Sequence, residues 1–270
     1  MTRYYSRPLM LGAALIAVLG LPFSAGAADS YYLSLGDSLA AGYQPIPPPW
    51  NHGYADQLQA KIPSLQLKKL GCYKHETTST MINGGACFYP HQTQLAEAIE
   101  FLQDPNNSVA LITIDIGAND VLKCVSGVTL DQTCISGALT GIRHNLPIIL
   151  TALHTAAPGV PIVGMNYYDP LLASYINGNS AFEDSLPVFE QFNNTLERIY
   201  KAAGSRVANV EGAFSTFDFT TQVVSPQFGT IPLDVARICQ WTWACTPSSD
   251  IHPNNKGYGV ITRAFWKVLP

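Results

Sequence analysis

The chain has 270 residues, of which 47% are hydrophobic and 13% are charged. This composition allows a sizeable core and argues against an intrinsically disordered chain. The formal net charge of −4 excludes the strongly basic surface that proteins use to bind nucleic acid. We therefore expect a globular protein with no nucleic-acid partner.

The N-terminal residues have the pattern of a secretory signal peptide. Arg3 and Arg7 give a positive start, an apolar run follows over residues 9–23, and the small residues 25–27 offer a cleavage site. The apolar run is shorter than the roughly 20 residues that a membrane-spanning helix needs. We expect residues 1–27 to be a cleaved signal. The mature protein is then secreted, into the periplasm or outside the cell, as a monomer with no stable membrane insertion.

The remaining residues, 28–270, alternate between short apolar runs and longer amphipathic stretches. The apolar runs predict strands at 31–35, 65–70, 109–116, 160–166 and 206–210. The amphipathic stretches predict helices at 54–62, 93–102, 135–156, 186–203 and 258–268. Apolar strands separated by helices indicate a parallel sheet that is covered on both faces. The sequence therefore predicts one α/β domain, a three-layer αβα flavodoxin-like fold with a five-stranded parallel sheet.

Six cysteines follow the predicted signal and fall into three close pairs. An even number of cysteines in an exported chain favours disulfides. The alternative, a metal site, lacks a C-x-x-C motif and zinc-finger spacing of Cys with His. We expect no metal and no other cofactor. The expected disulfides are Cys72–Cys87, Cys124–Cys134 and Cys239–Cys245.

Polar residues follow two of the predicted strands, at the edge of the sheet where ligands bind. The first strand ends at Gly36-Asp37-Ser38, where a serine at a tight turn can point its hydroxyl into the crevice. The third strand ends at Gly117-Ala118-Asn119, whose side-chain amide could donate to an oxyanion. Taken singly, each motif equally describes a helix cap or a turn.

A histidine near the C-terminus has an acid two residues before it, in Asp250-Ile251-His252-Pro253. This arrangement suits a catalytic base that is held by a carboxylate, although alone it equally describes a surface histidine. With the residues that follow the first and third strands, the three motifs would face one crevice. Together they indicate a nucleophilic serine site.

These motifs, in this order, resemble the SGNH (GDSL) hydrolase family. The matches are Leu35–Leu39, Gly117–Asp120 and Asp250–Pro253, and the stretch from Gly71 to Gly85 resembles the family's second block, particularly in its exported bacterial esterases. The resemblance covers nearly the whole mature chain. It implies that Ser38 is the nucleophile and that His252 acts as general base and then as general acid. It also implies that Asn119 and the backbone N–H of Ser38 donate to the oxyanion.

The chain departs from the family's pattern at two positions. The second block normally has a glycine before its acid–Thr pair, whose N–H donates to the oxyanion, and here His75 precedes Glu76-Thr77. We expect the His75 N–H to donate instead, with Gly71 as the alternative. The family's acid usually stands three residues before the histidine, where this chain has Ser249. Either Asp250 reaches the imidazole or a backbone carbonyl orients the ring, and we expect Asp250.

An α/β-hydrolase lipase is the nearest alternative, because Gly36–Ala40 nearly fits G-x-S-x-G. In that fold the serine follows several strands, and the acid lies well before the histidine in the chain. Here the serine opens the fold and the acid and histidine are adjacent, so we expect the SGNH fold.

The resemblance implies an esterase or lipase that cleaves a small-molecule or lipid acyl ester. A polysaccharide deacetylase and a non-catalytic carbohydrate-binding protein on the same fold remain the alternatives. Several large side chains are candidates for lining the substrate site, and Trp241 and Trp243 could equally bind a sugar ring. The candidates are Tyr43, Ile46, Trp50, Phe88, Tyr167, Tyr168, Trp241 and Trp243.

Overall fold

A computed structural model describes residues 1–2, 29–127 and 129–269. Apart from its first two residues, the predicted signal peptide lies outside the described residues. Among the helices described, none is both long and apolar enough to cross a membrane.

The central sheet contains five parallel strands, in the spatial order β2-β1-β3-β6-β7. The strands are β1 (Asp29–Gly36), β2 (Gln66–Lys69), β3 (Asn107–Asp115), β6 (Ile162–Met165) and β7 (Arg206–Ala208). This order is that of flavodoxin-like folds, so the predicted architecture is confirmed. The order reverses between β1 and β3, and such a reversal opens a crevice at the carboxyl ends of the strands.

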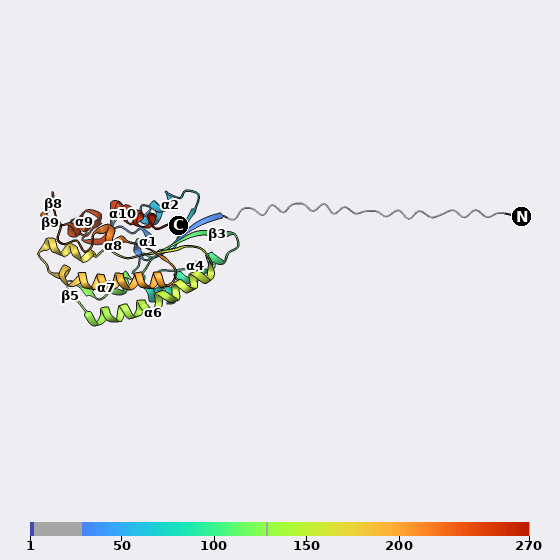
Figure 1. Cartoon of the computed structure of the whole chain (residues 1–270), viewed down its shortest axis with the longest axis horizontal. Helices are drawn as coiled ribbons and strands as arrows, with labels where there is room; N and C mark the ends of the chain where they lie inside the picture. The colour runs from blue at the N-terminus through green and yellow to red at the C-terminus, as the bar shows by residue number, and fades with distance from the viewer. Residues whose placement is uncertain (3–28, 128, 270) are drawn as a thin grey trace.

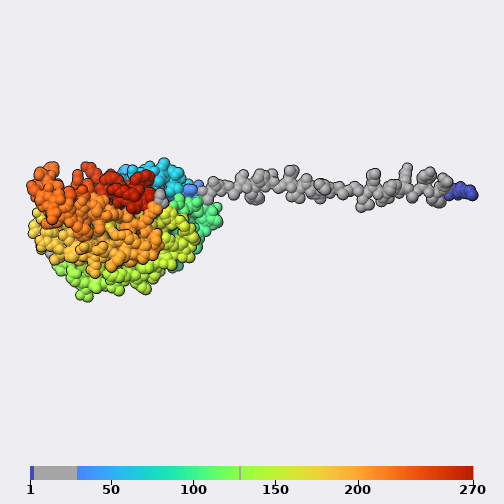
Figure 2. All heavy atoms as spheres, in the orientation of Figure 1, coloured from blue at the N-terminus to red at the C-terminus, as the bar shows by residue number. Residues whose placement is uncertain are grey.

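Helices cover both faces of the sheet (Figure 1). One layer holds α2 (Tyr54–Gln59), α8 (Val210–Phe214), α9 (Leu233–Trp241) and α10 (Asn255–Trp266). The other holds α4 (Gln94–Gln103), α6 (Gln132–Ala156) and α7 (Ala181–Ala202). Figure 2 shows the C-terminal helix, in red, beside the light-blue segment that contains α2, in agreement with their packing.

Burial on both faces explains why the central strands β1, β3 and β6 are mostly apolar. In β1, both Tyr32 and Leu33 are fully buried although they point to opposite faces. In β3, Ile112 and Ile114 point to one face and Thr113 to the other, and all three are fully buried. Each such apolar side chain contributes about 1.5–3 kcal/mol by leaving water. This packing fixes the strand ends on which the polar residues stand.

Several short elements were not predicted, because each is too short to show a hydrophobic period. Three short helices follow strands β1, β2 and β3, and a 3₁₀ helix follows β6. These are α1 (Ser38–Ala41), α3 (Thr78–Asn83), α5 (Ala118–Leu122) and η1 (Pro170–Asn177). Three antiparallel pairs of short strands are also present, namely β4 (Val125–Ser126) with β5 (Thr129–Leu130), β8 (Gln222–Ser225) with β9 (Gly229–Pro232), and β10 (Thr242–Trp243) with β11 (Asp250–Pro253).

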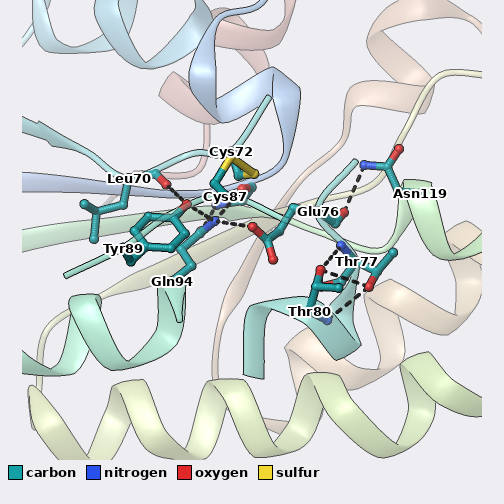
Figure 3. The surroundings of a disulfide bond; sticks show 10 residues. Leu70, Cys72, Glu76, Thr77, Thr80, Cys87, Tyr89, Gln94 and Asn119 are labelled. Atoms are coloured by element: carbon teal, nitrogen blue, oxygen red, sulfur yellow. Dashed lines mark hydrogen bonds between the residues drawn. A yellow bond between two sulfur atoms is a disulfide. The ribbon is translucent and has the colours of Figure 1, made fainter. Parts of the chain in front are cut away.

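All three predicted disulfides are present in the structure, with Cα–Cα distances of 5.8, 5.5 and 4.9 Å along the chain. Cys72–Cys87 joins the segment after β2 to the loop before α4 (Figure 3). Cys124–Cys134 joins the end of α5 to the start of α6, and Cys239–Cys245 joins α9 to the loop before β11. Two of the three therefore constrain loops that lead to candidate site residues.

Candidate active site

Ser38 is the first residue of α1, directly after the turn that ends β1. Gly36 makes this turn with φ 134°, and a Cβ there would lie 2.0 Å from the carbonyl oxygen of Asp115 on the neighbouring strand. Asp37 caps α1 by accepting from the N–H of Leu39 at 2.9 Å. Glycine is therefore required at the turn, and the serine hydroxyl is presented at the edge of the sheet.

Gln94 of α4 holds the same turn from the other side. Its side-chain oxygen accepts from the Gly36 N–H at 2.6 Å, and its amide donates to the Gly36 carbonyl at 2.9 Å. Gln94 is fully buried, so both bonds lie away from solvent. Its role was not predicted, because a buried glutamine leaves no signal in a helical pattern.

His252, on β11, contacts both Ser38 and Asp250. Its Nε2 lies 2.7 Å from Ser38 Oγ, and its Nδ1 lies 2.7 Å from Asp250 Oδ1. The same carboxylate oxygen accepts from the His252 backbone N–H at 2.9 Å. When Nδ1–H donates to the carboxylate, the Nε2 lone pair is free to accept the serine proton. The geometry is that of a nucleophile, a base and an orienting acid in line.

Asp250 is suited to remain ionised in this position. Partial burial raises its pKa, but the hydrogen bonds and the charge of His252 outweigh burial, so the net pKa lies below the ordinary value. Ser249, at the family's usual acid position, has φ 44° and its hydroxyl bonds only to the Thr246 carbonyl, at 3.5 Å. The ring is thus oriented by the Asp250 side chain, not by Ser249 or a backbone carbonyl.

Aromatic side chains hold the histidine loop in place. Tyr168 donates its hydroxyl to the Ile251 carbonyl at 2.9 Å. The Tyr43 ring packs edge-on against His252 with centroids 4.6 Å apart, and Tyr258 donates to the Tyr43 carbonyl at 2.6 Å. These contacts come from the loop after α1, the loop after β6 and helix α10, so the imidazole position is set by the fold.

Asn119 lies in the first turn of α5, whose N-cap is Gly117 with φ 115°. One hydrogen of its side-chain amide is donated to the Glu76 carbonyl at 2.9 Å (Figure 3). This bond fixes which way the amide faces and leaves the second hydrogen for another acceptor. Asn119 and Ser38 line the same cavity.

His75 has the left-handed backbone conformation, with φ 52°, and its side chain is exposed. Glycine adopts this conformation without strain, which gives a physical reason for a glycine at this position in the family. Among the hydrogen bonds of the described residues, the N–H groups of Ser38 and His75 find no acceptor. Gly71, the alternative donor, does not line the cavity. A Cβ there would lie 2.4 Å from the Ala41 nitrogen, so packing against α1 accounts for that glycine.

A cavity of about 590 Å³ opens beside Ser38, within the range of small-molecule sites. It has a mainly apolar and aromatic interior, and its exposed side is the loop Tyr73-Lys74-His75. The remaining lining residues are Asp37, Ser38, Leu39, Tyr43, Ala118, Asn119, Leu122, Tyr167, Tyr168, Pro170, Phe189, Asp250, Ile251 and His252.

The predicted substrate residues divide into two groups. Tyr43, Tyr167 and Tyr168 line the cavity, whereas Ile46, Trp50, Phe88, Trp241 and Trp243 do not.

The excluded tryptophans make other contacts. Trp241 packs edge-on against Phe214 at 5.2 Å, and Trp243 donates to Gln44 at 3.3 Å. Trp50 packs at a tilt against Tyr43, with centroids 4.9 Å apart, and so lies one ring behind the lining.

A buried pair of carboxyl groups, Asp37 and Asp115, lies beneath the nucleophile. Tyr54 donates to Asp115, and Tyr167 donates to Asp37 at 3.3 Å. Burial and the charge of Asp37 raise the pKa of Asp115 well above its ordinary value. The Asp115 carboxyl accepts from the backbone N–H of Asp37 and Ala40, at 3.3 and 3.2 Å, and thereby anchors α1.

No group of three or more His, Cys, Asp or Glu side chains suited to a metal ion occurs in the described part of the chain.

Similarity to solved structures supports the fold. The extracellular lipase of Streptomyces rimosus aligns over 90% of this chain and 100% of its own, with a TM-score of 0.56 and 16% identity. A putative GDSL-like lipase of Parabacteroides merdae aligns over 88% of this chain and 94% of its own, with a TM-score of 0.55 and 16% identity. Phospholipase A1 of Streptomyces albidoflavus aligns over 90% of this chain and 100% of its own, with a TM-score of 0.53 and 15% identity. No curated protein sequence matches the chain at a significant level.

The sequence profile of the GDSL-like lipase/acylhydrolase family matches residues 34–260, which include the Ser38 turn, Asn119 and the Asp250–His252 segment. This match covers most of the chain and all three motifs. The chain therefore belongs to the GDSL-like lipase/acylhydrolase family.

Proposed function

We propose that the chain is a serine hydrolase of carboxylic esters that works through an acyl-enzyme on Ser38. The observation that carries the proposal is the pair of contacts that His252 makes. Its Nε2 lies 2.7 Å from Ser38 Oγ, and its Nδ1 lies 2.7 Å from Asp250 Oδ1. All three residues line the cavity, so the carbonyl of a bound ester can reach the Ser38 hydroxyl.

In the first half of the reaction, Ser38 Oγ attacks the ester carbonyl carbon and His252 Nε2 takes the serine proton. The negative charge on the carbonyl oxygen is held by the N–H groups of Ser38 and His75 and by the free amide hydrogen of Asn119. When the tetrahedral intermediate collapses, the leaving alkoxide takes the proton from Nε2 and departs as the alcohol. The acyl group stays on Ser38.

In the second half, His252 Nε2 takes a proton from water as that water attacks the acyl-enzyme. When the second tetrahedral intermediate collapses, His252 Nε2 gives this proton to the leaving Ser38 Oγ, and the carboxylic acid is released. Asp250, which is ionised, stabilises the imidazolium that forms in each half.

The apolar lining favours an acyl group as the bound part of the substrate. Leu122 and Phe189 line the cavity, and Phe189 is buried. Trp241 and Trp243, the side chains that would favour a polysaccharide deacetylase, do not line the cavity. We also propose that the enzyme is secreted and acts as a monomer without a cofactor. The three disulfides support secretion, because disulfides persist in oxidising compartments.

The test is hydrolysis of p-nitrophenyl esters of increasing chain length by the parent, Ser38→Ala and His252→Ala proteins. We expect both variants to lose turnover while circular dichroism shows an intact fold. Turnover that persists at the parental rate in either variant would exclude this mechanism. An inactive parent that still binds oligosaccharides would favour the carbohydrate-binding alternative.

A further inference from the structure

Three exposed apolar residues belong to the loop at the open side of the cavity or to segments that are bonded or packed to that loop. Tyr73 is 46% exposed, Ile46 44% and Phe88 91%. Isolated exposed apolar residues are common on proteins, so only their grouping is informative. We call Ile46, Trp50, Tyr73 and Phe88 the aromatic rim.

The aromatic rim is continuous with the catalytic base. The ring of Tyr43 contacts His252, and Trp50 packs at a tilt against Tyr43 with centroids 4.9 Å apart. On its other side Trp50 packs against Tyr73 at 5.2 Å, and its indole N–H donates to the Ile46 carbonyl at 2.9 Å. A series of contacting rings, Tyr43, Trp50 and Tyr73, thus connects the imidazole with the protein surface.

Phe88 is held beside the same loop by covalent and hydrogen bonds on either side of it. Cys87 is bonded to Cys72, which directly precedes Tyr73. Tyr89 donates its hydroxyl to the Leu70 carbonyl at 2.6 Å (Figure 3). Phe88 stands between these two anchors and is nonetheless almost fully exposed. A fixed backbone that keeps a phenylalanine in water suits a ring that binds a partner.

The segments that carry the aromatic rim lack negative charge, unlike the chain as a whole. Residues 43–52, 71–75 and 84–92 contain no acidic residue, although the net charge of the chain is −4. Lys74 has its Nζ 5.6 Å from the Tyr73 ring, and it forms no ion pair with any described residue. The loop before Trp50 exposes three successive prolines, whose backbone is stiff.

We propose that the aromatic rim docks on a phospholipid surface, so that the cavity opens against the lipid. Tryptophan and tyrosine prefer the boundary between water and lipid, and apolar side chains such as Ile46 and Phe88 gain by leaving water there. The Lys74 ammonium is placed to meet lipid phosphate groups. The inference rests on the proposed ester hydrolysis, since docking brings acyl esters to Ser38.

The experiment measures binding to phosphatidylcholine vesicles by co-sedimentation, in a Ser38→Ala background that prevents lipid cleavage. The test variant is Ile46→Ser with Phe88→Ser. The matched control is Ile148→Ser, because Ile148 is 43% exposed but lies on α6, away from the rim. We expect the control to bind like the parent and the double variant to bind at least about tenfold more weakly. With Ser38 restored, the double variant keeps the parental kcat/KM on p-nitrophenyl acetate.

Equal vesicle binding by the double variant and the control would overturn the proposal, and so would a parent that does not bind vesicles. A parental dimer that the double variant dissociates, seen by analytical ultracentrifugation, would assign the rim to a contact between copies instead. Binding is measured on inactive protein and activity on a soluble ester. Failure of the docking proposal can therefore be told apart from failure of the hydrolase proposal.

Discussion

Replacing Asp250 by Asn tests how the imidazole is oriented. The carboxylate accepts two bonds from His252, at 2.7 Å from Nδ1 and 2.9 Å from the backbone N–H. An asparagine keeps the shape, but both bonds go to one oxygen, Oδ1, so an NH2 group in that place faces Nδ1 as a donor and gives up the backbone bond. The ring proton then moves to Nε2, which can no longer take the proton of Ser38. The charge that stabilises the imidazolium is also lost.

The expected loss for Asp250→Asn is about 10³–10⁴-fold in kcat, or about 4–5.5 kcal/mol of transition-state stabilisation. The assay is hydrolysis of a short p-nitrophenyl ester at neutral pH, with circular dichroism to check the fold. Because Asp250 is partly exposed and the replacement is isosteric, we expect no large change in thermal stability.

Ser249→Ala is the matched control, one residue away in the same loop. The Ser249 hydroxyl contacts only the Thr246 carbonyl and does not touch the ring, so this variant should keep parental activity. An Asp250→Asn variant as active as the parent would refute the reasoning. A Ser249→Ala variant as impaired as Asp250→Asn would refute it equally, because the acid position of the family would then matter in this chain.

Three further outcomes are expected. Asn119→Ala should lower kcat by about 10²–10³-fold with little change in KM, since the donor acts on the oxyanion; a rise in KM alone would contradict that role. His75→Gly should keep parental kcat without lowering Tm, because the donor is a backbone N–H and glycine relieves about 1 kcal/mol of left-handed strain; lost activity would show that the imidazole itself acts. Burial raises the pKa of Asp169 to about 7, so the folded state binds more protons than the unfolded state between about pH 4 and 7, and stability falls as pH rises through that window. Asp169→Asn should therefore flatten the dependence of Tm on pH there, and an unchanged pH profile would exclude Asp169 as its source.

The sheet could be predicted because its three central strands, β1, β3 and β6, are buried on both faces and carry nearly unbroken apolar runs. Ile112 and Ile114, for example, belong to a run whose only reasonable reading is a buried strand. The helices α1, α3 and α5 could not be predicted, because four to six residues show no period. The starts of α1 and α5 were nevertheless marked by the Gly-Asp-Ser and Gly-Ala-Asn sequences.

The candidate site was predictable where a residue follows a strand and unpredictable where it depends on tertiary contact. Ser38 and Asn119 stand at strand ends, so the parallel sheet brings them together. The reach of Asp250 depends on the left-handed turn at Ser249, which spacing alone does not reveal.

The lining residues Leu122 and Phe189 come from helices, where apolar periodicity does not separate core from cavity. Asp115 did leave a signal, an acid at the end of a buried strand, but its partner Asp37 could only be found in three dimensions.

The most direct test of the central claim is intact-protein and peptide mass spectrometry after treatment with a fluorophosphonate. Such a probe bonds covalently to a serine whose hydroxyl is activated by a neighbouring base. The account predicts one adduct, on Ser38, that disappears in His252→Ala as well as in Ser38→Ala. An adduct on another residue, or labelling of Ser38 that is as fast without His252, would contradict it.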